Sequence, residues 1–376
     1  MAALKSIMKN AGLKILVVIG TRPEIIKLSA LIPLLEQRTN VTIVHTGQHY
    51  DDNMRALFFH ELQLRSPDYI LRMGEYPTHI TQISKTLLDL EQIIMAGHFN
   101  MVLVQGDTNT TLCGALAAAK CQIPIVHVES GCRSFNKQMP EEINRIIVDH
   151  ISDICLAPDM VSKNNLLREG IKTDYVVGDT GIDACLRMKR IIEKRGKKQN
   201  RNRKKILLTL HRAENTDNDV RLREILGAVN HLSTLDIEVL FPMHPKTKKM
   251  INKFGIVLDK KIRVTPPLSY FNTISNIMDS YLVMTDSGGL QVESAVLNTP
   301  CVVLRNETEW MELIQSGKNV LAGTQRDQII NKITELVICP QKVRKMARIK
   351  TKFTSGACEK ICDIIMEELN ARVAKD

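Results

Sequence analysis

The sequence lacks long hydrophobic runs and contains few aromatic residues. Its longest apolar segments, 13–20 and 101–105, have the length of a strand, whereas a membrane-spanning helix needs about 20 apolar residues. Residues 1–12 carry two lysines but no continuous apolar stretch, so no signal peptide is expected there. Aromatic residues make up only 4% of the 376 residues, against 44% hydrophobic and 24% charged residues. This composition is typical of a folded globular protein and excludes a fibrous or disordered chain.

The sequence also lacks the cysteine patterns of disulfide frameworks and metal sites. Its nine cysteines are an odd number, are scattered, and lie mostly in apolar segments. We therefore expect buried reduced thiols in a cytoplasmic protein. Cys358 and Cys362 lie one helical turn apart, which fits a packed helix face. With neither H-E-x-x-H nor a paired C-x-x-C motif present, we expect no metal and no other cofactor.

Acidic residues are absent from one strongly basic segment, 194–205 (KRGKKQNRNRKK). Its eight basic residues account for most of the formal net charge of +10. No aromatic residues interleave the basic ones, which disfavours a single-stranded nucleic-acid site. A short basic run containing Gly and Asn is more typical of a solvated linker. We therefore expect neither a nucleic-acid nor a membrane partner.

Short β-rich apolar runs alternate with amphipathic helical stretches such as 23–36 and 110–120. This alternation predicts parallel sheets built from βαβ units, and the length suits two domains of about 150–200 residues. We predict an α/β fold of two Rossmann-like, doubly wound domains, 1–190 and 191–376, with the boundary near 185–205. The predicted strands are 13–20, 41–47, 101–107, 123–130 and 153–158, then 205–211, 237–244, 262–268, 280–287 and 300–306.

Unusual polar clusters follow the predicted strands. In an open parallel sheet, ligands bind in the crevice beyond the carboxyl ends of the strands. One such cluster could be a turn, but seven of them across both halves predict a shared central cleft. The clusters are GTRPE, TGQHY, GDTNTT, HVESG, LTLHRAEN, FPMHP and TDSGG.

The cluster GTRPE (20–24) joins the first predicted strand to a helix. Thr21 and Glu24 have the spacing of a capping box, with Pro23 in the first turn. A helix-capping role does not explain why an arginine stands at position 22. An arginine beside a helix N-terminus at the edge of a sheet is well placed to hold a diphosphate, so we favour a ligand role for Arg22.

The cluster DSGG (286–289) joins a strand to a helix in the second half. Gly288 and Gly289 would let the backbone approach a bound group, and the helix N-terminus offers N–H donors to an anion. A tight turn is the alternative, and the segment is neither G-x-G-x-x-G nor a Walker A motif. Glu293, one turn later, could accept hydrogen bonds from a ribose diol or be an ordinary exposed acid.

Acidic residues of the first half form the predicted reaction centre. Asp107 and Glu129 end predicted strands, and Glu141 and Glu142 open a helix in MPEEINR. Asp107 could instead cap the helix that starts at 110, and Glu141 could satisfy a helix dipole. Glu129 closes an apolar strand, where partial desolvation would suit an acid or base.

Two histidines end strands of the second half, His211 in LTLHRAEN and His244 in FPMHPK. Taken singly, a histidine at a strand end is more often structural than catalytic. Opposite a cluster of carboxylates, however, both become candidates for binding phosphate or transferring protons.

Eight motifs resemble, in order and spacing, those of the non-hydrolysing UDP-N-acetylglucosamine 2-epimerases. The resemblance covers about residues 13–370. It implies a fold similar to that of GT-B glycosyltransferases, a homodimer, and a C-terminal helix (about 357–371) that packs back on the first domain. The motifs are GTRPE, TGQHY, GDTNTT, HVESGCRS, PEEINR, LHRAEN, TDSGGLQVE and LRNETEW.

The resemblance also implies a site and a reaction. The family eliminates UDP to leave a 2-acetamidoglucal, then adds UDP back while a proton reaches the opposite face of C2. This chemistry requires a base, an acid and a cationic clamp on the diphosphate, shielded from water. The positions that match catalytic residues are Asp107, Glu129, Glu141 and His211. Those that match UDP- or sugar-binding residues are Arg22, Gln48, Arg145, His244, Ser287, Gly288, Gly289, Glu293 and Arg305.

Some positions depart from the commonest pattern of the family. Tyr50 replaces a frequent arginine in a region that forms an activator site in some bacterial members. Members specific for UDP-N-acetylglucosamine commonly read TERPE where this chain has Trp310 in TEWME, and Val292 stands where an acid is usual. Both features resemble a subgroup that includes epimerases of UDP-2,3-diacetamido-2,3-dideoxy-glucuronate as well as archaeal-type relatives. A uronate would require an extra cation in the sugar pocket, which Lys137 or Arg133 could provide.

The resemblance therefore implies conversion of UDP-N-acetylglucosamine to UDP-N-acetylmannosamine for surface polysaccharide precursors. The alternative is the same reaction on the diacetamido-glucuronate. A hydrolysing epimerase is disfavoured, because HVESGCRS stands where we associate an HGGE-type sequence with those enzymes. A GT-B glycosyltransferase using a UDP-sugar donor is compatible with the two-domain outline alone.

Overall fold

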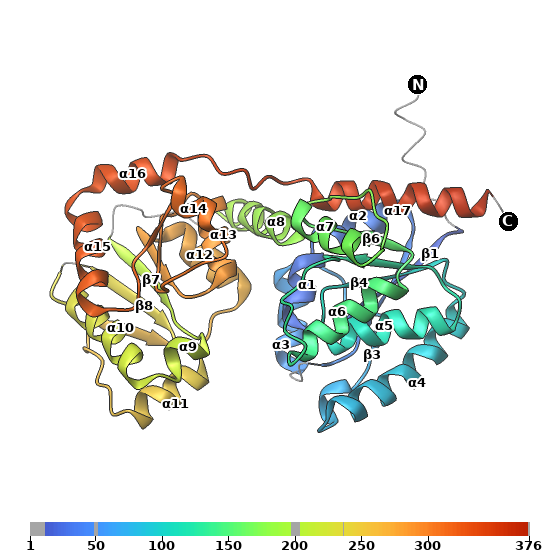
Figure 1. Cartoon of the computed structure of the whole chain (residues 1–376), viewed down its shortest axis with the longest axis horizontal. Coiled ribbons are helices and arrows are strands. Elements are labelled where there is room, and N and C mark those ends of the chain that lie inside the picture. The colour runs from blue at the N-terminus through green and yellow to red at the C-terminus, as the bar shows by residue number, and fades with distance from the viewer. Residues whose placement is uncertain (1–11, 49–51, 197–203, 236, 375–376) are drawn as a thin grey trace. The chain divides into compact units, whose positions relative to one another are not determined.

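The chain folds into two compact units (Figure 1). Unit 1 comprises Met1–Ala184 and Ser355–Asp376, and unit 2 comprises Cys185–Thr354. Tyr50 and most of the basic segment 194–205 lie outside the residues that the structure describes. The computed structural model describes residues 12–48, 52–196, 204–235 and 237–374.

Unit 1 contains six parallel strands in the order β3-β2-β1-β4-β5-β6. Nearly every residue of β1 and β4 is buried, so both faces of the sheet are covered, which explains the unbroken apolar runs. The five strands predicted in this half are confirmed, and β3 is an additional edge strand. The strands are β1 (Lys14–Ile19), β2 (Asn40–His45), β3 (Tyr69–Ile70), β4 (Met101–Gln105), β5 (Ile125–Val128) and β6 (Ile154–Leu156).

Helices cover the sheet of unit 1, and one core cluster joins β1 and β4 to the helices α4 and α5. The helix α8 begins in unit 1 and continues into unit 2. The helices are α1 (Arg22–Leu28), α2 (Leu31–Arg38), α3 (Asp52–Glu61), the 3-10 helix η2 (Met73–Glu75), α4 (His79–Gly97), α5 (Asn109–Lys120), α6 (Pro140–Ile151), α7 (Met160–Arg168), α8 (Thr180–Lys194) and α17 (Ala357–Val373).

The single helix predicted at 23–36 is wrong, because the structure has the two helices α1 and α2 there. Pro33 explains the break. In one continuous helix it could not donate to the carbonyl of Ser29, and its ring would clash with that carbonyl. With the chain broken around Ser29 and Ala30, Pro33 falls in the first turn of α2, where no N–H partner is needed.

The C-terminal helix α17 belongs to unit 1 and packs beside α2 (Figure 1). Arg38 of α2 pairs with Asp363 of α17 at 2.6 Å. At the start of α17, the carboxylate of Asp183 accepts the N–H groups of Gly356 at 2.8 Å and Cys358 at 2.7 Å. Asp183 therefore satisfies donors at this helix N-terminus.

Unit 2 contains a second parallel sheet, with the order β12-β11-β10-β7-β8-β9. Counted within its own unit, each strand takes the same place as in unit 1. The five predicted strands are again confirmed, and β12 is additional. The strands are β7 (Lys205–Thr209), β8 (Glu238–Pro242), β9 (Ile262–Thr265), β10 (Leu282–Thr285), β11 (Cys301–Val303) and β12 (Asn319–Leu321).

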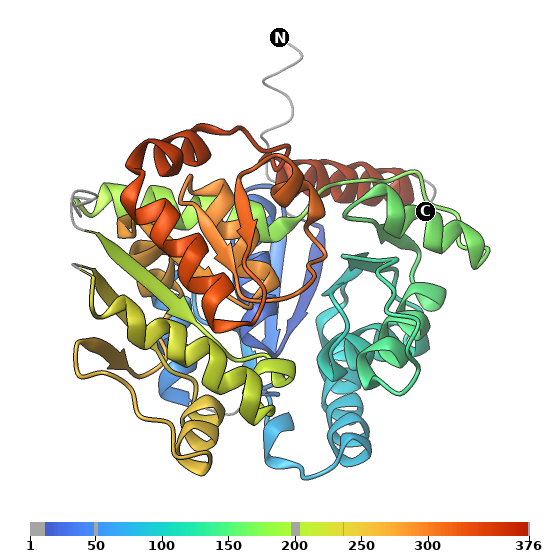
Figure 2. The same ribbon diagram turned by 60° about the vertical axis from the view of Figure 1, so that its left-hand side comes forward.

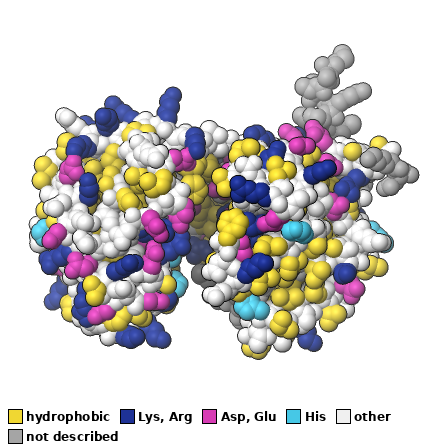
Figure 3. Space-filling view, in the orientation of Figure 1, with side chains coloured by type: hydrophobic (Ala, Val, Ile, Leu, Met, Phe, Trp, Pro, Cys, Tyr) yellow, Lys and Arg dark blue, Asp and Glu magenta, His cyan; other side chains and the backbone are white. Residues whose placement is uncertain are grey.

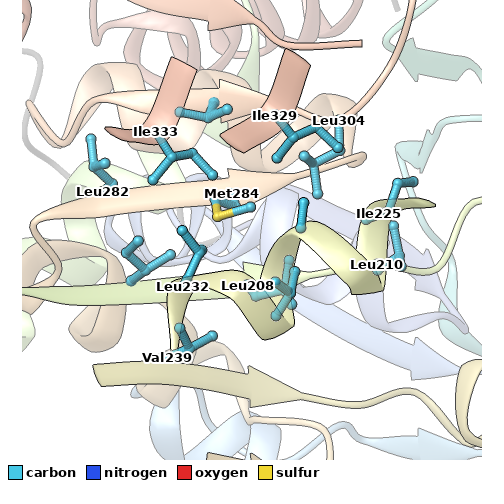
Figure 4. Close-up of a cluster of buried hydrophobic side chains, with 14 of the residues drawn as sticks. Leu208, Leu210, Ile225, Leu232, Val239, Leu282, Met284, Leu304, Ile329 and Ile333 are labelled. Carbon is cyan, nitrogen blue, oxygen red and sulfur yellow. The ribbon is translucent and has the colours of Figure 1, made fainter. Parts of the chain in front are cut away.

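A single large core cluster joins this sheet to its helices (Figure 4). Leu208 and Met284 of the sheet pack in this cluster with Ile225 of α10 and Ile333 of α15, and α10 and α15 lie side by side (Figure 2). The helices are α9 (Ala213–Thr216), α10 (Asp219–Leu232), α11 (Pro245–Lys253), α12 (Tyr270–Asp279), α13 (Gly288–Val296), α14 (Met311–Gln315), α15 (Arg326–Ile338) and α16 (Pro340–Arg348).

Each sheet has one switch point, a pair of neighbouring strands whose following connections run towards opposite edges of the sheet. In unit 1 it lies between β1 and β4, and in unit 2 between β7 and β10. The segments that follow these four strands are GTRPE, GDTNTT, LHRAEN and DSGG. Because ligands of doubly wound sheets bind at this point, each unit presents one candidate binding edge.

Candidate active site

Glu24 connects the two segments at the switch point of unit 1. Its carboxylate accepts the N–H groups of Gly20 at 2.7 Å and Thr21 at 2.8 Å, which is the Glu half of the predicted capping box. Its other oxygen accepts the hydroxyl of Thr108, the N-cap of α5, at 2.5 Å. Burial raises the pKa of Glu24, and these hydrogen bonds oppose the rise. Glu24 therefore holds the turn after β1 against the start of α5.

Gly20 is required by close packing. A Cβ atom at this position would lie 2.0 Å from the hydroxyl of Thr46 and 2.1 Å from that of Thr110. These two threonines also hydrogen-bond each other at 2.7 Å. The strands β1, β2 and the helix α5 therefore meet at a point with no room for a side chain.

Asp107 follows β4 and pairs with Arg145 of α6. It does not cap α5, because Thr108 provides the cap. Asn144, also on α6, donates to the Asp107 carbonyl at 3.0 Å. Burial raises the pKa of the Asp107 carboxyl; Arg145 opposes this rise and the negative charge of Glu129 adds to it.

Glu129 follows β5 and is paired with Lys27, a residue that the sequence analysis missed. The Lys27 ammonium lies 2.6 and 2.5 Å from the two carboxylate oxygens, and the Gln105 amide donates to one of them. Asp179 lies near Lys27 as well. Burial alone would lower the pKa of Lys27, but the charges of Glu129 and Asp179 raise it. Lys27 is therefore an ammonium that contacts both oxygens of Glu129.

The three carboxylates predicted to be catalytic in this half, Asp107, Glu129 and Glu141, line one pocket of about 260 Å³. Glu141 is exposed in the first turn of α6. Gln48, a predicted substrate-binding residue, also lines the pocket and accepts from the N–H and hydroxyl of Thr110 at 3.0 and 2.8 Å. The strand topology thus brings residues from four separate motifs together.

Two other candidates of this half have structural partners. Glu142 is buried and accepts from the N–H groups of Ser134 and Phe135 at 2.9 and 2.8 Å, which closes the loop before α6. Arg133, suggested as a cation for a uronate, has a side chain only 1% exposed and is paired with Asp149 and Glu169. Because both carboxylates occupy its guanidinium, that suggestion for Arg133 is wrong.

At the switch point of unit 2, Asp286 holds the segment that carries His211. The Asp286 carboxylate is fully buried and accepts the N–H groups of His211 at 3.2 Å and Arg212 at 3.0 Å. The His211 ring nitrogen Nδ1 lies 3.3 Å from the same carboxylate, and its side chain is 46% exposed. Asp286 therefore fixes the backbone and orients the ring of His211.

The helix α13 starts directly after Asp286, with Ser287 as its N-cap. A Cβ atom at Gly289 would meet nothing within 4 Å. One at Gly288 would lie 3.5 Å from the indole nitrogen of Trp310 and 3.7 Å from both the Arg212 guanidinium and the Glu309 carboxylate. The charges of Arg212 and Glu309 oppose each other beside Gly288, and the N–H groups beside open space at Gly289 are what suits an anion.

The remaining predicted binding residues have mixed surroundings. His244 is the N-cap of α11 and accepts the N–H of Lys246 at 3.2 Å, which accounts for it structurally. Arg305 pairs with Glu214 at 3.0 Å and Glu309 at 2.9 Å. Glu293 lies on α13 and is partly buried, and the Arg22 guanidinium lies 4.4 Å from the centre of the Phe58 ring. The substrate contacts of these four stay predictions.

Within the described ranges, no group of three or more His, Cys, Asp or Glu residues is arranged to hold a metal ion. The same part of the chain contains no helix of the length and apolarity that a membrane span requires. All nine cysteines lie in described segments, and each is a free thiol.

Comparisons with known proteins agree with this geometry. The family model described as UDP-N-acetylglucosamine 2-epimerase matches residues 34–366. The chain is 42% identical over 337 residues to a UDP-N-acetylglucosamine 2-epimerase of Methanococcus maripaludis, which covers 86% of this chain and 92% of that protein. It is 43% identical over 325 residues to a UDP-2,3-diacetamido-2,3-dideoxy-D-glucuronate 2-epimerase of Pseudomonas aeruginosa, covering 85% and 90%.

The fold is similar to that of solved structures. One of them is the UDP-GlcNAc 2-epimerase of Methanocaldococcus jannaschii in complex with UDP-GlcNAc and UDP. It superposes with a TM-score of 0.76 at 40% identity, covering 94% of this chain and all of that one. The similarity therefore extends over both units.

Proposed function

The chain belongs to the UDP-N-acetylglucosamine 2-epimerase family, and from this premise we propose that it inverts C2 of UDP-N-acetylglucosamine without hydrolysis, giving UDP-N-acetylmannosamine. The observation that carries the proposal is the pocket of unit 1 lined by Asp107, Glu129 and Glu141. Inversion at a carbon that bears hydrogen needs proton-transfer groups on both of its faces. Carboxylates from three motifs around one pocket supply such groups.

The proposed reaction starts when a carboxylate takes the C2 proton. The electrons of that C–H bond form a C1–C2 double bond as the C1–O bond breaks, and UDP leaves as an anion. A carboxylic acid then protonates C2 of the bound glucal from the other face, while an oxygen of UDP re-forms the bond to C1. One carboxyl group has gained a proton and another has lost one, and exchange with solvent restores both.

Asp107 and Glu129 fit complementary roles in these steps. The raised pKa of Asp107 favours the protonated form that an acid requires. Glu129, whose two oxygens both accept from the Lys27 ammonium, is assigned the role of the base. In the reverse direction the two exchange roles. Glu141, at the exposed start of α6, is proposed to relay protons to solvent.

Unit 2 is proposed to bind UDP. The N–H groups at the start of α13, around Ser287, Gly288 and Gly289, would receive the diphosphate. His211, oriented by Asp286, would stabilise the charge that develops on the leaving UDP. Glu293, one turn into α13, would accept hydrogen bonds from the ribose diol. Unit 1 would then carry the proton transfer and unit 2 the leaving group.

The choice of sugar is supported by the charges in unit 1. Lys27 is the only Lys or Arg among the residues that line the described pocket, and Glu129 neutralises it. Arg133 is paired and buried, and Lys137 is exposed outside the pocket lining. Among the described residues that line this pocket, a uronate carboxylate would therefore meet no unpaired Lys or Arg, which favours a neutral N-acetylglucosamine. The diacetamido-glucuronate, the substrate in the printed name of the Pseudomonas relative, is the second candidate.

We propose further that the enzyme is a cytoplasmic homodimer that supplies surface polysaccharide precursors. The nine free thiols support a reducing compartment. Exposed apolar side chains on α4 and α6 support self-association, and hydrophobic side chains gather over the helices of unit 1 (Figure 3). We call Ile80, Leu88, Met95, Ile143 and Ile147 the α4/α6 apolar face.

The test is proton NMR of UDP-N-acetylglucosamine incubated with the enzyme in D2O. We expect the C2 proton signal to disappear while the sugar nucleotide stays intact and UDP-N-acetylmannosamine forms. Release of free N-acetylmannosamine and UDP would instead indicate a hydrolysing epimerase. Exchange seen only with the diacetamido-glucuronate would establish the second candidate and reject the first.

Substitutions test whether exchange of the C2 proton depends on the pocket carboxylates. Glu129→Gln and Asp107→Asn should abolish exchange, because each loses a proton-transfer group, and should keep UDP binding within about tenfold. Glu75→Gln alters an exposed glutamate outside the pocket lining and should exchange like the wild type. Loss of UDP binding in the first two variants would show that the carboxylates are structural instead.

A further inference from the structure

A chain of four ionisable side chains, three of them buried and Glu169 partly exposed, lies next to the pocket of unit 1 without lining it. His127 of β5 contacts Asp149 of α6 at 2.7 Å, and Asp149 contacts Arg133 at 2.6 Å. Arg133 in turn pairs with Glu169 at 2.7 Å. We call these four residues the His127 network. Removing each ion from water costs several kcal/mol, so a buried ion pair adds little net stability to the fold. The His127 network is therefore expected to have a role other than stabilising the fold.

Both ring nitrogens of His127 face hydrogen-bond acceptors. Its Nε2 lies 2.8 Å from the carbonyl oxygen of Gly106, which can only accept. Its Nδ1 faces Asp149, whose other oxygen accepts from the Gly131 N–H at 3.0 Å and from Arg133. Burial alone would raise the pKa of Asp149, but His127 and Arg133 hold it below its ordinary value. Asp149 is therefore ionised, and Nε2 of His127 must carry the proton that it donates to the Gly106 carbonyl.

The network is attached to the backbone on either side of the reaction centre. Gly106 directly precedes Asp107, and Gly131 is two residues after Glu129. Glu129 has a φ of 70°, a conformation that residues other than glycine rarely adopt and that surrounding contacts must maintain. The single contact between His127 and Asp149 thus connects the segments that carry Asp107 and Glu129.

We propose that the hydrogen-bonded pair of His127 and Asp149 is a positioning device that sets the separation of the Asp107 and Glu129 carboxyl groups. His127 holds the Gly106 carbonyl while Asp149 holds the Gly131 N–H. The inference rests on the proposed function, because those two carboxyl groups must reach opposite faces of C2. A displacement of about 1 Å can cost about a hundredfold in rate, so the pair affects turnover without touching the substrate.

Substitutions can remove one link at a time. His127→Asn places an amide nitrogen near the position of Nδ1, and His127→Gln places one near Nε2, so each keeps one of the two hydrogen bonds. We expect kcat for C2 exchange to fall about 10- to 100-fold in both. His127→Ala, which keeps neither link, should fall further. KM and UDP binding should stay within about threefold, because none of these variants alters a pocket side chain.

Thr39→Val is the matched control. It removes another buried hydrogen bond of unit 1, from the Thr39 hydroxyl to the Leu13 carbonyl at 2.6 Å. This bond lies at the amino ends of the strands, away from both carboxylate segments. The control should lower Tm as the His127 variants do and leave kcat unchanged. If the control loses kcat in the same proportion to its loss of Tm, the network is merely structural and the proposal fails.

A measurement on the unaltered enzyme makes the test independent of variant folding. In NMR spectra of enzyme labelled with 15N-histidine, the signals that vanish in His127→Gln belong to His127. Its Nε2 should carry a proton that is hydrogen-bonded to the Gly106 carbonyl. A ring whose Nε2 carries no proton, or wild-type kcat in a folded His127→Asn variant, would overturn the inference. Absence of C2 exchange in the wild type would instead reject the proposed function, and the NMR result would still report this hydrogen bond.

Discussion

Arg145 governs the titration of Asp107. Its guanidinium contacts the Asp107 carboxyl and lies 3.2 Å from Glu142. Burial raises the pKa of Asp107, and the positive charge of Arg145 opposes that rise by favouring the carboxylate. Arg145→Met removes the opposing charge, so the pKa of Asp107 should rise further. The limb of the pH–rate profile for C2 exchange that reports Asp107 should therefore move to higher pH.

Arg145→Lys is the control for this prediction, because it keeps a positive charge near Asp107 and should keep the limb closer to its original pH. The family resemblance gives Arg145 a different role, in substrate binding. If that is its main role, Arg145→Met will raise KM for UDP-N-acetylglucosamine at least about tenfold and leave the limb in place. That outcome would contradict the electrostatic role.

For single residues, the sequence predicts which carboxylates lie close together but not which cations they pair with. Asp107 and Glu129 end adjacent strands, so topology alone places them close together. Lys27 could not be predicted, because a lysine on a helix is normally solvated and only the fold brings Glu129 to it. Arg133 was misjudged for the same reason, since its partner Glu169 follows the separate helix α7.

Lys318 fastens the helix α16 to the sheet of unit 2. This fully buried lysine precedes β12, and its ammonium donates to the carbonyls of Ala347 and Ile349 at 2.9 and 2.8 Å. It also donates to the Asn298 side chain at 2.9 Å. The ammonium therefore supplies a partner to the C-terminal end of α16, where helix carbonyls lack partners within the helix.

Lys318→Met keeps the length of the side chain but leaves three acceptors without this donor, two of them carbonyls of the partly buried residues Ala347 and Ile349. We expect the free energy of unfolding to fall by about 2–4 kcal/mol, measured by denaturant unfolding. Lys342→Met, which removes an exposed pair with Glu335, should leave stability unchanged. A Lys318→Met variant as stable as the wild type would mean that other groups or water satisfy the three acceptors.

Helices and strands with a long, uninterrupted hydrophobic pattern could be predicted from the sequence. Short strands and interrupted helices could not. The central strands β1, β4 and β7 are almost continuously apolar, so their sequences indicate buried parallel strands. The edge strands β3 and β12 have two and three residues, too few to show a period. Pro33 causes the break between α1 and α2, and its effect depends on where the preceding helix ends.

A substitution of Gly289 tests the proposal that unit 2 binds UDP. Because a Cβ atom there would meet nothing within 4 Å, Gly289→Ala should fold normally. Its methyl group would occupy the space proposed for the diphosphate, so the Kd for UDP, measured by calorimetry, should rise at least about tenfold. Gly227→Ala makes the same change on α10, where the nearest atom would be a flexible Arg326 side-chain atom 3.4 Å away. Its Kd should match the wild type; equal losses in both variants would contradict the proposed UDP site.

For the whole molecule, the fold class was predictable because every βαβ unit repeats the same local signal. The two doubly wound parallel sheets are confirmed, as is the place of polar clusters at the carboxyl ends of their strands. The substituents of the sugar leave no comparable signal, because one or two side chains can discriminate a carboxylate from a hydroxymethyl group. The identity of the substrate therefore depends on such details as the pairing of Arg133.

Self-association is the last prediction, and the α4/α6 apolar face carries it. Ile80, Leu88 and Met95 repeat at helical spacing along one side of α4, and Ile143 and Ile147 lie one turn apart on α6. A twofold contact would bury this face against its own copy. Leu88→Lys or Ile143→Lys would then place a charge in an apolar interface and raise the dimer Kd about 100-fold or more.

Size-exclusion chromatography with light scattering should show a dimer for the wild type and a shift towards monomer for both lysine variants. Since both side chains are exposed in the single chain, thermal unfolding of the monomer should change little. Val257→Lys replaces an apolar residue of unit 2 that is 80% exposed and should stay dimeric. A monomeric wild type would reject the homodimer. Dimers that persist in both lysine variants would keep the homodimer but exclude this face, because a buried unpaired ammonium would have to remain desolvated in the contact.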